Sequence, residues 1–347
     1  MLPRLKSLTV VILTRERQEV LEESIEYWHN CEIKSLVLDN SIAPLDSTRI
    51  PPSTNYIHCP GVSFAGRSII ASENIDSIFS IICSDDERYL PSALDEMLGE
   101  FEKIDNLVSV GGLAIGIDKY GPIVTGTGAY FSMRTYHNSD DDAFQRLDCH
   151  FNLDSKSNKI GALYRVYYSS ALVELLKVFG KCTQISTPYI FEVTAEVLST
   201  LLGGTTYVDT IYWVRNWSLA PVQKTDWDRR ILFYNWWTSP EYQIEREHWL
   251  RVIMSTQLID AEVAVITEYI SRICEKSPRD NSSNRNLKDR LYKSVQPVTK
   301  YFIYKIFAPD RIPKQLHDCV ESILTMGIKI NTQELQVAVR GIQGIKS

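Results

Sequence analysis

The sequence predicts an α/β protein in which a mostly parallel sheet is flanked by helices and followed by a helical C-terminal region. Three observations favour this class. Short apolar runs alternate with segments of helical period over the first hundred residues, polar residues follow these runs directly, and helical segments succeed one another beyond residue 225. Such alternation is expected of strand–helix–strand units, whereas a bundle or a sandwich repeats one kind of element.

The predicted elements follow in order along the chain. The first strand is expected at residues 8–13, where the apolar run is continuous and β-branched, as in a strand covered on both faces. An amphipathic helix is then expected, because apolar residues recur with a spacing of three and four. The later expectations are a strand at 35–38, a Pro-rich loop, a helix over 65–75, a strand at 78–83, a helix from Pro91 to Phe101, and strands at 107–110 and 113–117.

The second half of the chain is less regular. Residues 118–163 are rich in glycine and polar side chains and are predicted to be an irregular insertion. Helices are expected at 170–179 and at 188–202, the latter beginning at Thr187 and Pro188. We therefore predict a domain at 1–220 and a helical region at 221–347, with a polar linker near 277–286.

Composition excludes several classes of protein. The 347 residues carry a net charge of −6, without the basic footprint that nucleic-acid binding needs. Seven scattered cysteines, with no Cys-x-x-Cys pair, argue against a disulfide framework or a zinc site and favour the cytoplasm. No apolar run is long enough to span a membrane. Basic and aromatic residues occur together at 276–307. Two interpretations of this segment remain open: a peripheral contact with the inner membrane, or an ordinary packed helix.

Polar residues stand at the ends of three predicted strands, at 14–16, 39–41 and 85–87. Ligands of open parallel sheets bind outside the carboxyl ends of the strands. A nucleoside diphosphate is anionic and rich in oxygen, so a divalent cation held by carboxylates would join it to an acidic protein. These strand ends therefore predict a nucleotide site.

The stretches TVVILTRERQEVLEESIEYW, LVLDNS and FAGRSIIASENIDSIFSIICSDDERYLPSALDEM resemble the nucleotide-binding half of family-two GT-A glycosyltransferases. The agreement covers residues 7–112 and continues more weakly to about 220. The resemblance implies a GT-A fold, in which the family's Asp-x-Asp motif corresponds to 85–87, with Glu87 one methylene longer than the usual Asp. It implies nucleotide or diphosphate contacts from Thr14, Arg15, Glu16, Asp39, Arg67, Asp85, Asp86 and Arg215, and Mg²⁺ or Mn²⁺ held by Asp85, Asp86 and Glu87.

Each of these positions has a plainer alternative. An acidic triplet after a strand can be a solvated turn or a charge at a helix N-terminus. Asp39 can close an Asx turn, and Arg67 or Arg215 can form a structural ion pair. His150 has no partner at ligand spacing and is predicted to be structural, while Trp213 and Trp217 remain open between core residues and sugar platforms.

A base is expected in the second half of the chain, because inverting relatives carry a carboxylate at the start of a helix near the acceptor. Glu192 is the predicted base. Glu196, one turn further along the same face, and the acids of 140–154 are the alternatives.

The function that this resemblance implies is inverting transfer of a sugar from a nucleotide-sugar, with UDP as the first guess, in bacterial surface polysaccharide assembly. The acceptor would be a saccharide or a lipid-linked saccharide. A sugar nucleotidyltransferase is disfavoured, because TRERQEV contains no glycine for a phosphate loop. A binding or scaffold protein without turnover remains an alternative, and the sequence leaves the oligomeric state open.

Overall fold

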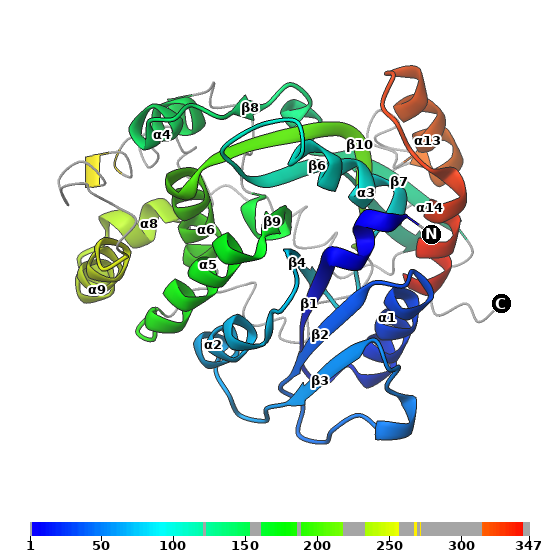
Figure 1. Cartoon of the computed structure of the whole chain (residues 1–347), viewed down its shortest axis with the longest axis horizontal. Coiled ribbons are helices and arrows are strands. Elements are labelled where there is room, and N and C mark those ends of the chain that lie inside the picture. The colour runs from blue at the N-terminus through cyan, green and yellow to red at the C-terminus, as the bar shows by residue number, and fades with distance from the viewer. Residues whose placement is uncertain are drawn as a thin grey trace, which may run out of the picture.

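The computed structural model describes residues 2–120, 123–152, 161–185, 189–217, 233–256, 267–268, 271 and 314–342. Within these ranges one sheet of eleven strands runs through the molecule, with helices on both of its faces (Figure 1). The predicted class, α/β with a mostly parallel sheet flanked by helices, is confirmed by this arrangement.

The parallel half of the sheet has the strand order β3-β2-β1-β4. Every strand and helix predicted here is present, with ends shifted by a few residues. The one missed element is β3, where a loop was expected, because its residues are only half buried and follow two prolines. The elements are β1 Leu8–Thr14, α1 Gln18–Asn30, β2 Lys34–Asp39, β3 Thr54–His58, α2 Phe64–Asn74, β4 Phe79–Ser84 and α3 Pro91–Glu100.

The prediction of separate strands at 107–110 and 113–117 was wrong, because a single strand, β6 Leu107–Tyr120, spans both. Gly111 and Gly112 interrupt the apolar run and suggested a break. They lie instead where β6 meets β10 Gly204–Asn216, and a Cβ there would stand 2.5 Å and 2.7 Å from the rings of Tyr207 and Tyr212. The glycines allow the aromatic rings of β10 to cross the sheet surface.

The prediction of an irregular insertion over 118–163 was also wrong in part. β7 Ile123–Ala129 pairs antiparallel with β6, and α4 Ala143–Asn152 forms a helix. The acidic run before α4 is its cap, since the Asp142 carboxylate accepts hydrogen bonds from the backbone N–H groups of Phe144 and Gln145. Three short strands also belong to the sheet, β5 Arg88–Tyr89, β8 His137–Asn138 and β9 Val166–Tyr168, and η4 Ala162–Tyr164 is a short 3-10 helix.

Alternating side chains of the central strands enter two hydrophobic cores, one on each face of the sheet. In β1, Val10 and Ile12 pack with α1 and α3, while Val11 packs with α5 Ser169–Lys181 and α6 Tyr189–Leu202. The helix predicted at 170–179 is present as α5. The predicted start of the next helix, at Thr187 and Pro188, lies outside the described residues. The second core also receives Trp236 and Trp249 from α8 Phe233–Thr238 and α9 Gln243–Met254.

Of the two described helices near the C-terminus, the first packs against β7 and the second lies beside α1 (Figure 1). β11 Lys314–Gln315 pairs with β7 and leads into α13 Leu316–Thr325 and α14 Thr332–Ile342. Within the described residues, no helix combines the length and hydropathy needed to cross a membrane. The predicted linker at 277–286 and membrane contact at 276–307 lie outside these residues and stay predictions.

Glu334 of α14 anchors this packing. Its carboxylate accepts hydrogen bonds from the Ser92 backbone N–H at 3.0 Å and from the Ser92 hydroxyl at 2.8 Å. Ser92 lies in the first turn of α3, where backbone N–H groups lack helical partners and negative charge is favourable. A carboxylate from the end of the chain thus caps a helix near its beginning.

We expect Glu334→Ala to lower the free energy of unfolding by about 1–2 kcal/mol, the usual cost of losing a helix cap with a charged acceptor. Urea unfolding followed by circular dichroism measures the change. Glu321→Ala is the control, because that side chain is 67% exposed on α13. Equal stability of the two variants would contradict a capping role for Glu334.

Candidate functional site

Three strand ends meet at one edge of the sheet. In the parallel register Thr14 pairs with Asp39, and Leu13 pairs with Ser84, the residue before Asp85. The polar residues after β1, β2 and β4 therefore lie side by side, as the sequence predicted.

A cavity of about 350 Å³ opens at the ends of β1 and β4. Three arginines and one aspartate bring charge to its wall, and apolar side chains close its sides. Among the predicted site residues Thr14, Arg15, Arg67 and Asp85 line the cavity, whereas Glu16, Asp39, Asp86, Glu87, Glu192 and Arg215 do not. The lining residues are Leu13, Thr14, Arg15, Arg17, Phe64, Arg67, Ile82, Cys83, Ser84, Asp85, Leu163 and Tyr164.

Arg17 joins the first two acids of the triplet. Its Nη1 lies 2.9 Å from Asp85 Oδ1 and its Nη2 lies 2.7 Å from Asp86 Oδ2. The second oxygen of Asp85 accepts the Thr14 hydroxyl at 2.5 Å. Burial raises the pKa of Asp85, and the positive charge of Arg17 and the Thr14 hydroxyl oppose that rise. Both oxygens of this nearly buried carboxylate are therefore occupied by side chains of β1 and the loop after it.

The third acid, Glu87, points to another partner. Its two oxygens accept hydrogen bonds from Trp213 Nε1 at 3.0 Å and from Arg215 Nε at 3.1 Å, both on β10. Burial raises the pKa of Glu87 to about 7, against the opposing charge of Arg215. The antiparallel pairing of β5 with β10 sets this contact, because it brings Arg88 opposite Val214.

Arg88 supports the acidic loop from below. Its side chain is completely buried, and Nη1 donates to the backbone carbonyls of Asp85 and Glu87, each at 2.7 Å. Nε and Nη2 have no hydrogen-bond partner among the described residues, and burial lowers the pKa of this guanidinium. The ring of Tyr27 lies 5.6 Å from it. The positive charge of Arg88 therefore lies in contact with the backbone of the acidic residues 85–87.

The second strand end is held by its own hydrogen bonds. Asp39 is fully buried and accepts the Ser41 backbone N–H at 2.9 Å, the Tyr56 hydroxyl at 2.6 Å and the Gln18 amide at 3.2 Å. Burial works to raise the pKa of Asp39, but these hydrogen bonds hold it below its ordinary value. The bond from Ser41 closes an Asx turn, which was the plainer alternative for this residue.

Two further predicted residues also make local contacts. Glu16 Oε1 accepts the backbone N–H of Ile42 at 2.8 Å, so it ties the first strand end to the second. Arg67 Nη1 donates to the Thr14 carbonyl at 3.2 Å, while its Nε is buried with no hydrogen-bond partner among the described residues. Arg67 thus brings unused donor capacity to the wall of the cavity.

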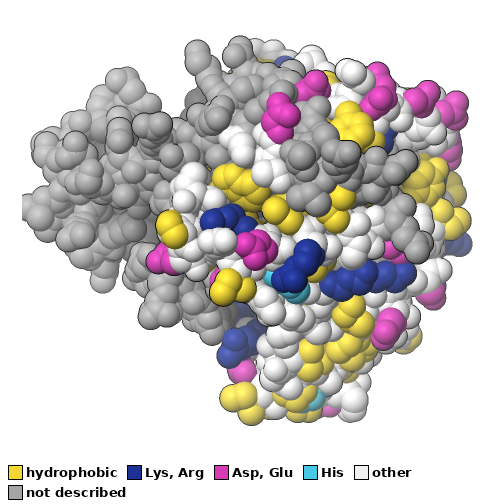
Figure 2. All heavy atoms as spheres, turned by 90° about the vertical axis from the view of Figure 1, so that its left-hand side faces the viewer, with side chains coloured by type: hydrophobic (Ala, Val, Ile, Leu, Met, Phe, Trp, Pro, Cys, Tyr) yellow, Lys and Arg dark blue, Asp and Glu magenta, His cyan; other side chains and the backbone are white. Residues whose placement is uncertain are grey.

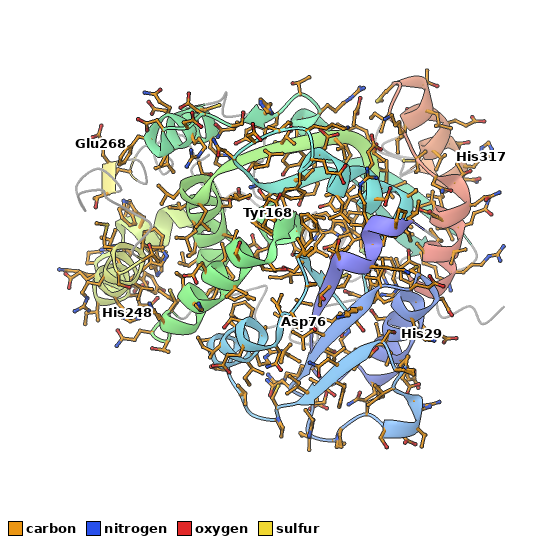
Figure 3. The ribbon with its side chains drawn as sticks, viewed as in Figure 1. His29, Asp76, Tyr168, His248, Glu268 and His317 are labelled. Atoms are coloured by element: carbon orange, nitrogen blue, oxygen red, sulfur yellow. The ribbon has the colours of Figure 1, made fainter. Side chains whose placement is uncertain are left out.

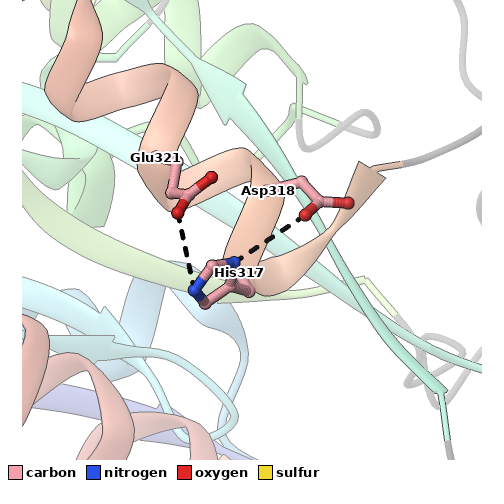
Figure 4. Close-up of side chains that lie close together, drawn as sticks. All are labelled: His317, Asp318 and Glu321. Atoms are coloured by element: carbon pink, nitrogen blue, oxygen red, sulfur yellow. Dashed lines mark ion pairs between the residues drawn. The ribbon is translucent and has the colours of Figure 1, made fainter.

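The three acids do not converge on one point, so they do not fit a shared metal ion as they stand. Arg17 occupies the position between Asp85 and Asp86, and Glu87 faces β10. In the described part of the chain, only His317, Asp318 and Glu321 place three ligand atoms within 4.8 Å of one another (Figure 4). Those side chains are exposed on α13, at the outer edge of the molecule (Figure 3).

Aromatic rings separate the cavity from β10. Trp213 is only 1% exposed, and the rings of Tyr164 and Tyr130 lie 4.1 Å and 5.5 Å from it. Arg215 stacks on Trp213 at 4.3 Å. Trp213 is therefore a core residue and offers no open face to a sugar, whereas Trp217 is 41% exposed.

The two candidate bases on α6 have different surroundings. Glu192 is half buried, and its charge acts on Tyr130 and Tyr164; the latter lines the cavity. Burial is the main reason that the pKa of Tyr130 rises to about 12, and Glu87 and Glu192 add to it. Glu192 therefore lies within electrostatic range of the aromatic wall.

Glu196 is instead locked in a buried ion cluster. Its Oε1 accepts the backbone N–H groups of Gly161 and Ala162 at 2.5 and 2.7 Å, and its Oε2 lies 2.7 Å from Arg165 and 3.2 Å from His150. Burial alone would raise the pKa of Glu196, but Arg165, His150 and the backbone donors lower it to about 2. A carboxylate in this state is a poor proton acceptor.

Three residues of the site, Arg17, Arg88 and Tyr164, were not predicted from the sequence. Arg17 follows β1 within TRER and was a visible candidate, because it stands at a polar strand end. Arg88 and Tyr164 carried no local pattern, since the pairing of β5 with β10 places Arg88 and the distant segment η4 brings Tyr164 to the cavity. Their roles depend on contacts between distant parts of the chain.

No protein-family model and no curated protein matches this sequence. The chain is similar in structure to S. aureus TarS 1-349. The crystal structure of TarS 1-349 matches with a TM-score of 0.48 and 12% identity, and the match covers 88% of this chain and 82% of that chain. The complex of the same protein with UDP-GlcNAc has a TM-score of 0.47 and 13% identity, covering 86% and 80%.

We expect Glu196→Gln to destabilise the protein by about 3–5 kcal/mol, because it leaves Arg165 buried without a counter-ion. The pKa of Glu196 is lowered from 4.5 to about 2, so its contribution to stability is complete above pH 4.5 and is lost as the pH falls towards 2. The difference in the free energy of unfolding between parent and variant should therefore be constant around neutral pH and should become smaller as the pH falls below 4.5.

Chemical unfolding of both proteins across this pH range measures the difference. Glu174→Gln on α5 is the control, since that carboxylate is exposed beside Lys177. A Glu196→Gln protein as stable as this control would exclude the cluster as a structural element.

Proposed function

We propose that this chain is a glycosyltransferase that binds a nucleotide-sugar in the cavity at the ends of β1 and β4. The observation that carries the proposal is the charge of the wall. Arg15, Arg17 and Arg67 face one anionic side chain, Asp85, so the cavity is net positive in a protein whose net charge is −6. A diphosphate is attracted to such a wall. The parallel strand ends and the predicted family resemblance support a nucleotide as its carrier.

The proposed reaction is inverting transfer of the sugar with Glu192 as the base, which is the role that the family resemblance implies. The bond between the anomeric carbon and the diphosphate oxygen breaks, and its electron pair leaves with the diphosphate. A bond forms from the anomeric carbon to the acceptor hydroxyl oxygen, and the proton of this hydroxyl passes to the Glu192 carboxylate. Arginine side chains on the wall stabilise the charge that develops on the leaving group. Attack from the face opposite the leaving group inverts the configuration.

The acceptor proposed from the resemblance is a saccharide or lipid-linked saccharide, and UDP is the first nucleotide to test. The expected Mg²⁺ or Mn²⁺ has no step in this mechanism, because Asp85, Asp86 and Glu87 do not converge on a common ligand position.

Nucleotide binding tests the proposal directly. A thermal-shift screen of UDP, GDP, CDP, ADP and dTDP, and of their sugars, should find one nucleotide that raises the melting temperature. Ligand at about 100 times its Kd stabilises the native state by about 2.7 kcal/mol, which is a shift of several degrees. Arg67→Met removes one guanidinium from the wall and should reduce the shift. No shift with any nucleotide would exclude the proposed donor site.

Glu192→Gln tests the assigned base. The amide keeps the size and one accepting oxygen of the side chain but cannot take up a proton. We therefore expect transfer to fall about 10²- to 10⁴-fold while nucleotide binding stays unchanged. Radiolabelled transfer from the donor found in the screen measures the rate.

Glu196→Gln is not a suitable control for this test, because Glu196 belongs to the buried ion cluster. Glu174→Gln, on the neighbouring helix α5, is the matched variant and should keep the parental rate. Transfer by Glu192→Gln within a few-fold of the parent would remove Glu192 from the mechanism. Donor binding without transfer by the parent to any saccharide acceptor would instead indicate a binding protein.

A further inference from the structure

The position between Asp85 and Asp86 is already filled by a cation of the chain itself. The two terminal nitrogens of Arg17 each contact one carboxylate, at 2.9 Å and 2.7 Å. This bridging geometry places the guanidinium at the point that a metal ion shared by the two acids would occupy. A planar guanidinium is suited to such paired contacts, because its donors project in a fixed fork.

The backbone fixes Arg17 in this place. It is the residue directly before α1, and its carbonyl accepts the first backbone bond of the helix, from Leu21 N–H at 2.9 Å. Burial alone would lower the pKa of Arg17, but the charges of Asp85 and Asp86 raise it. The guanidinium is therefore held as a permanent positive charge at the edge of the cavity.

Other arginines near the acidic residues 85–87 compensate their negative charge, so a metal ion is not needed to balance it. Arg88, buried behind the loop, donates to the carbonyls of Asp85 and Glu87. Glu87 is paired with Arg215 on β10. Arg15 and Arg67 line the same cavity as Arg17. Each acid of the triplet thus has an arginine partner, and the wall still carries an excess of positive charge.

We propose that Arg17 replaces the divalent cation at the acidic strand end, so that this chain binds a nucleoside diphosphate without a metal. The inference rests on the proposed function, since the anion that Arg17, Arg15 and Arg67 receive is the diphosphate of the donor. The carboxylates of Asp85 and Asp86 then hold the guanidinium in place, and the donor phosphates approach it from the cavity side. The face of the molecule in Figure 2 shows Lys and Arg side chains across its middle, together with acidic and apolar ones.

The test is calorimetric titration of the full chain with UDP, GDP, CDP, ADP and dTDP, in EDTA and in Mn²⁺. For the parent we expect one of these diphosphates to bind with affinities that agree within about twofold in the two conditions. Binding that requires Mn²⁺ would overturn the inference and leave the proposed function standing. No binding of any diphosphate in either condition would overturn both.

In Arg17→Ala we expect nucleoside diphosphate binding to become dependent on Mn²⁺. Loss of a charged donor should weaken binding in EDTA about tenfold or more. Because the substitution frees Asp85 and Asp86 for a metal, Mn²⁺ should restore part of the affinity. Arg17→Ala combined with Asp86→Asn should not recover in Mn²⁺. Parental affinity of Arg17→Ala in EDTA would contradict the assignment.

Two further variants separate this role from folding. Arg49→Ala removes a surface arginine paired with Glu22 and should bind like the parent in both conditions. Arg17→Lys keeps the charge but contacts only one carboxylate at a time, so it should bind a few-fold more weakly and remain independent of Mn²⁺. A Mn²⁺ requirement in Arg17→Lys, with a circular dichroism spectrum like that of the parent, would contradict a role based on charge.

Discussion

The parallel register of β2, β1 and β4 is the constraint on which the site depends. It brings Thr14 level with Asp39 and places Asp85 one residue beyond the neighbour of Leu13. Side chains that are far apart in the sequence therefore come within hydrogen-bond distance, as in the contact between the Thr14 hydroxyl and Asp85. A shift by one residue would turn each of these side chains to the opposite face of the sheet. The two packed cores prevent such a shift, because the alternate side chains of β1 are buried on both sides.

Burying carboxylates in such a place is costly unless opposite charges and hydrogen bonds accompany them. Asp85 has Arg17, Glu87 has Arg215, and Glu196 has Arg165. The partners come from different elements in each case, so the ion pairs also specify how the strands and helices assemble. The acids at the strand ends thus contribute to the architecture of the site, and the arginines that face the cavity supply its positive charge.

The sequence predicted the parallel half of the sheet because local patterns specify it: apolar runs mark buried strands, and a spacing of three and four marks helices. It failed where a tertiary contact overrides the local pattern. Gly111 and Gly112 suggested a break but make room for aromatic rings of β10. The same reasoning explains the site. Strand ends were predictable, whereas the pairing of Glu87 with β10 was not, since no spacing in the sequence shows which residue of a distant strand lies opposite.

The two glutamates of α6 show the same limit of local pattern. Glu192 and Glu196 lie one turn apart, and helical periodicity cannot distinguish them. Contacts from residues 161–165 set the environment of Glu196, which receives the backbone donors of Gly161 and Ala162 together with Arg165, and its pKa is lowered to about 2. A general base needs a pKa nearer to the working pH and a free lone pair. Of these two carboxylates, Glu196 therefore stabilises the fold and is unsuited to be the base, which leaves Glu192 as the base that we propose.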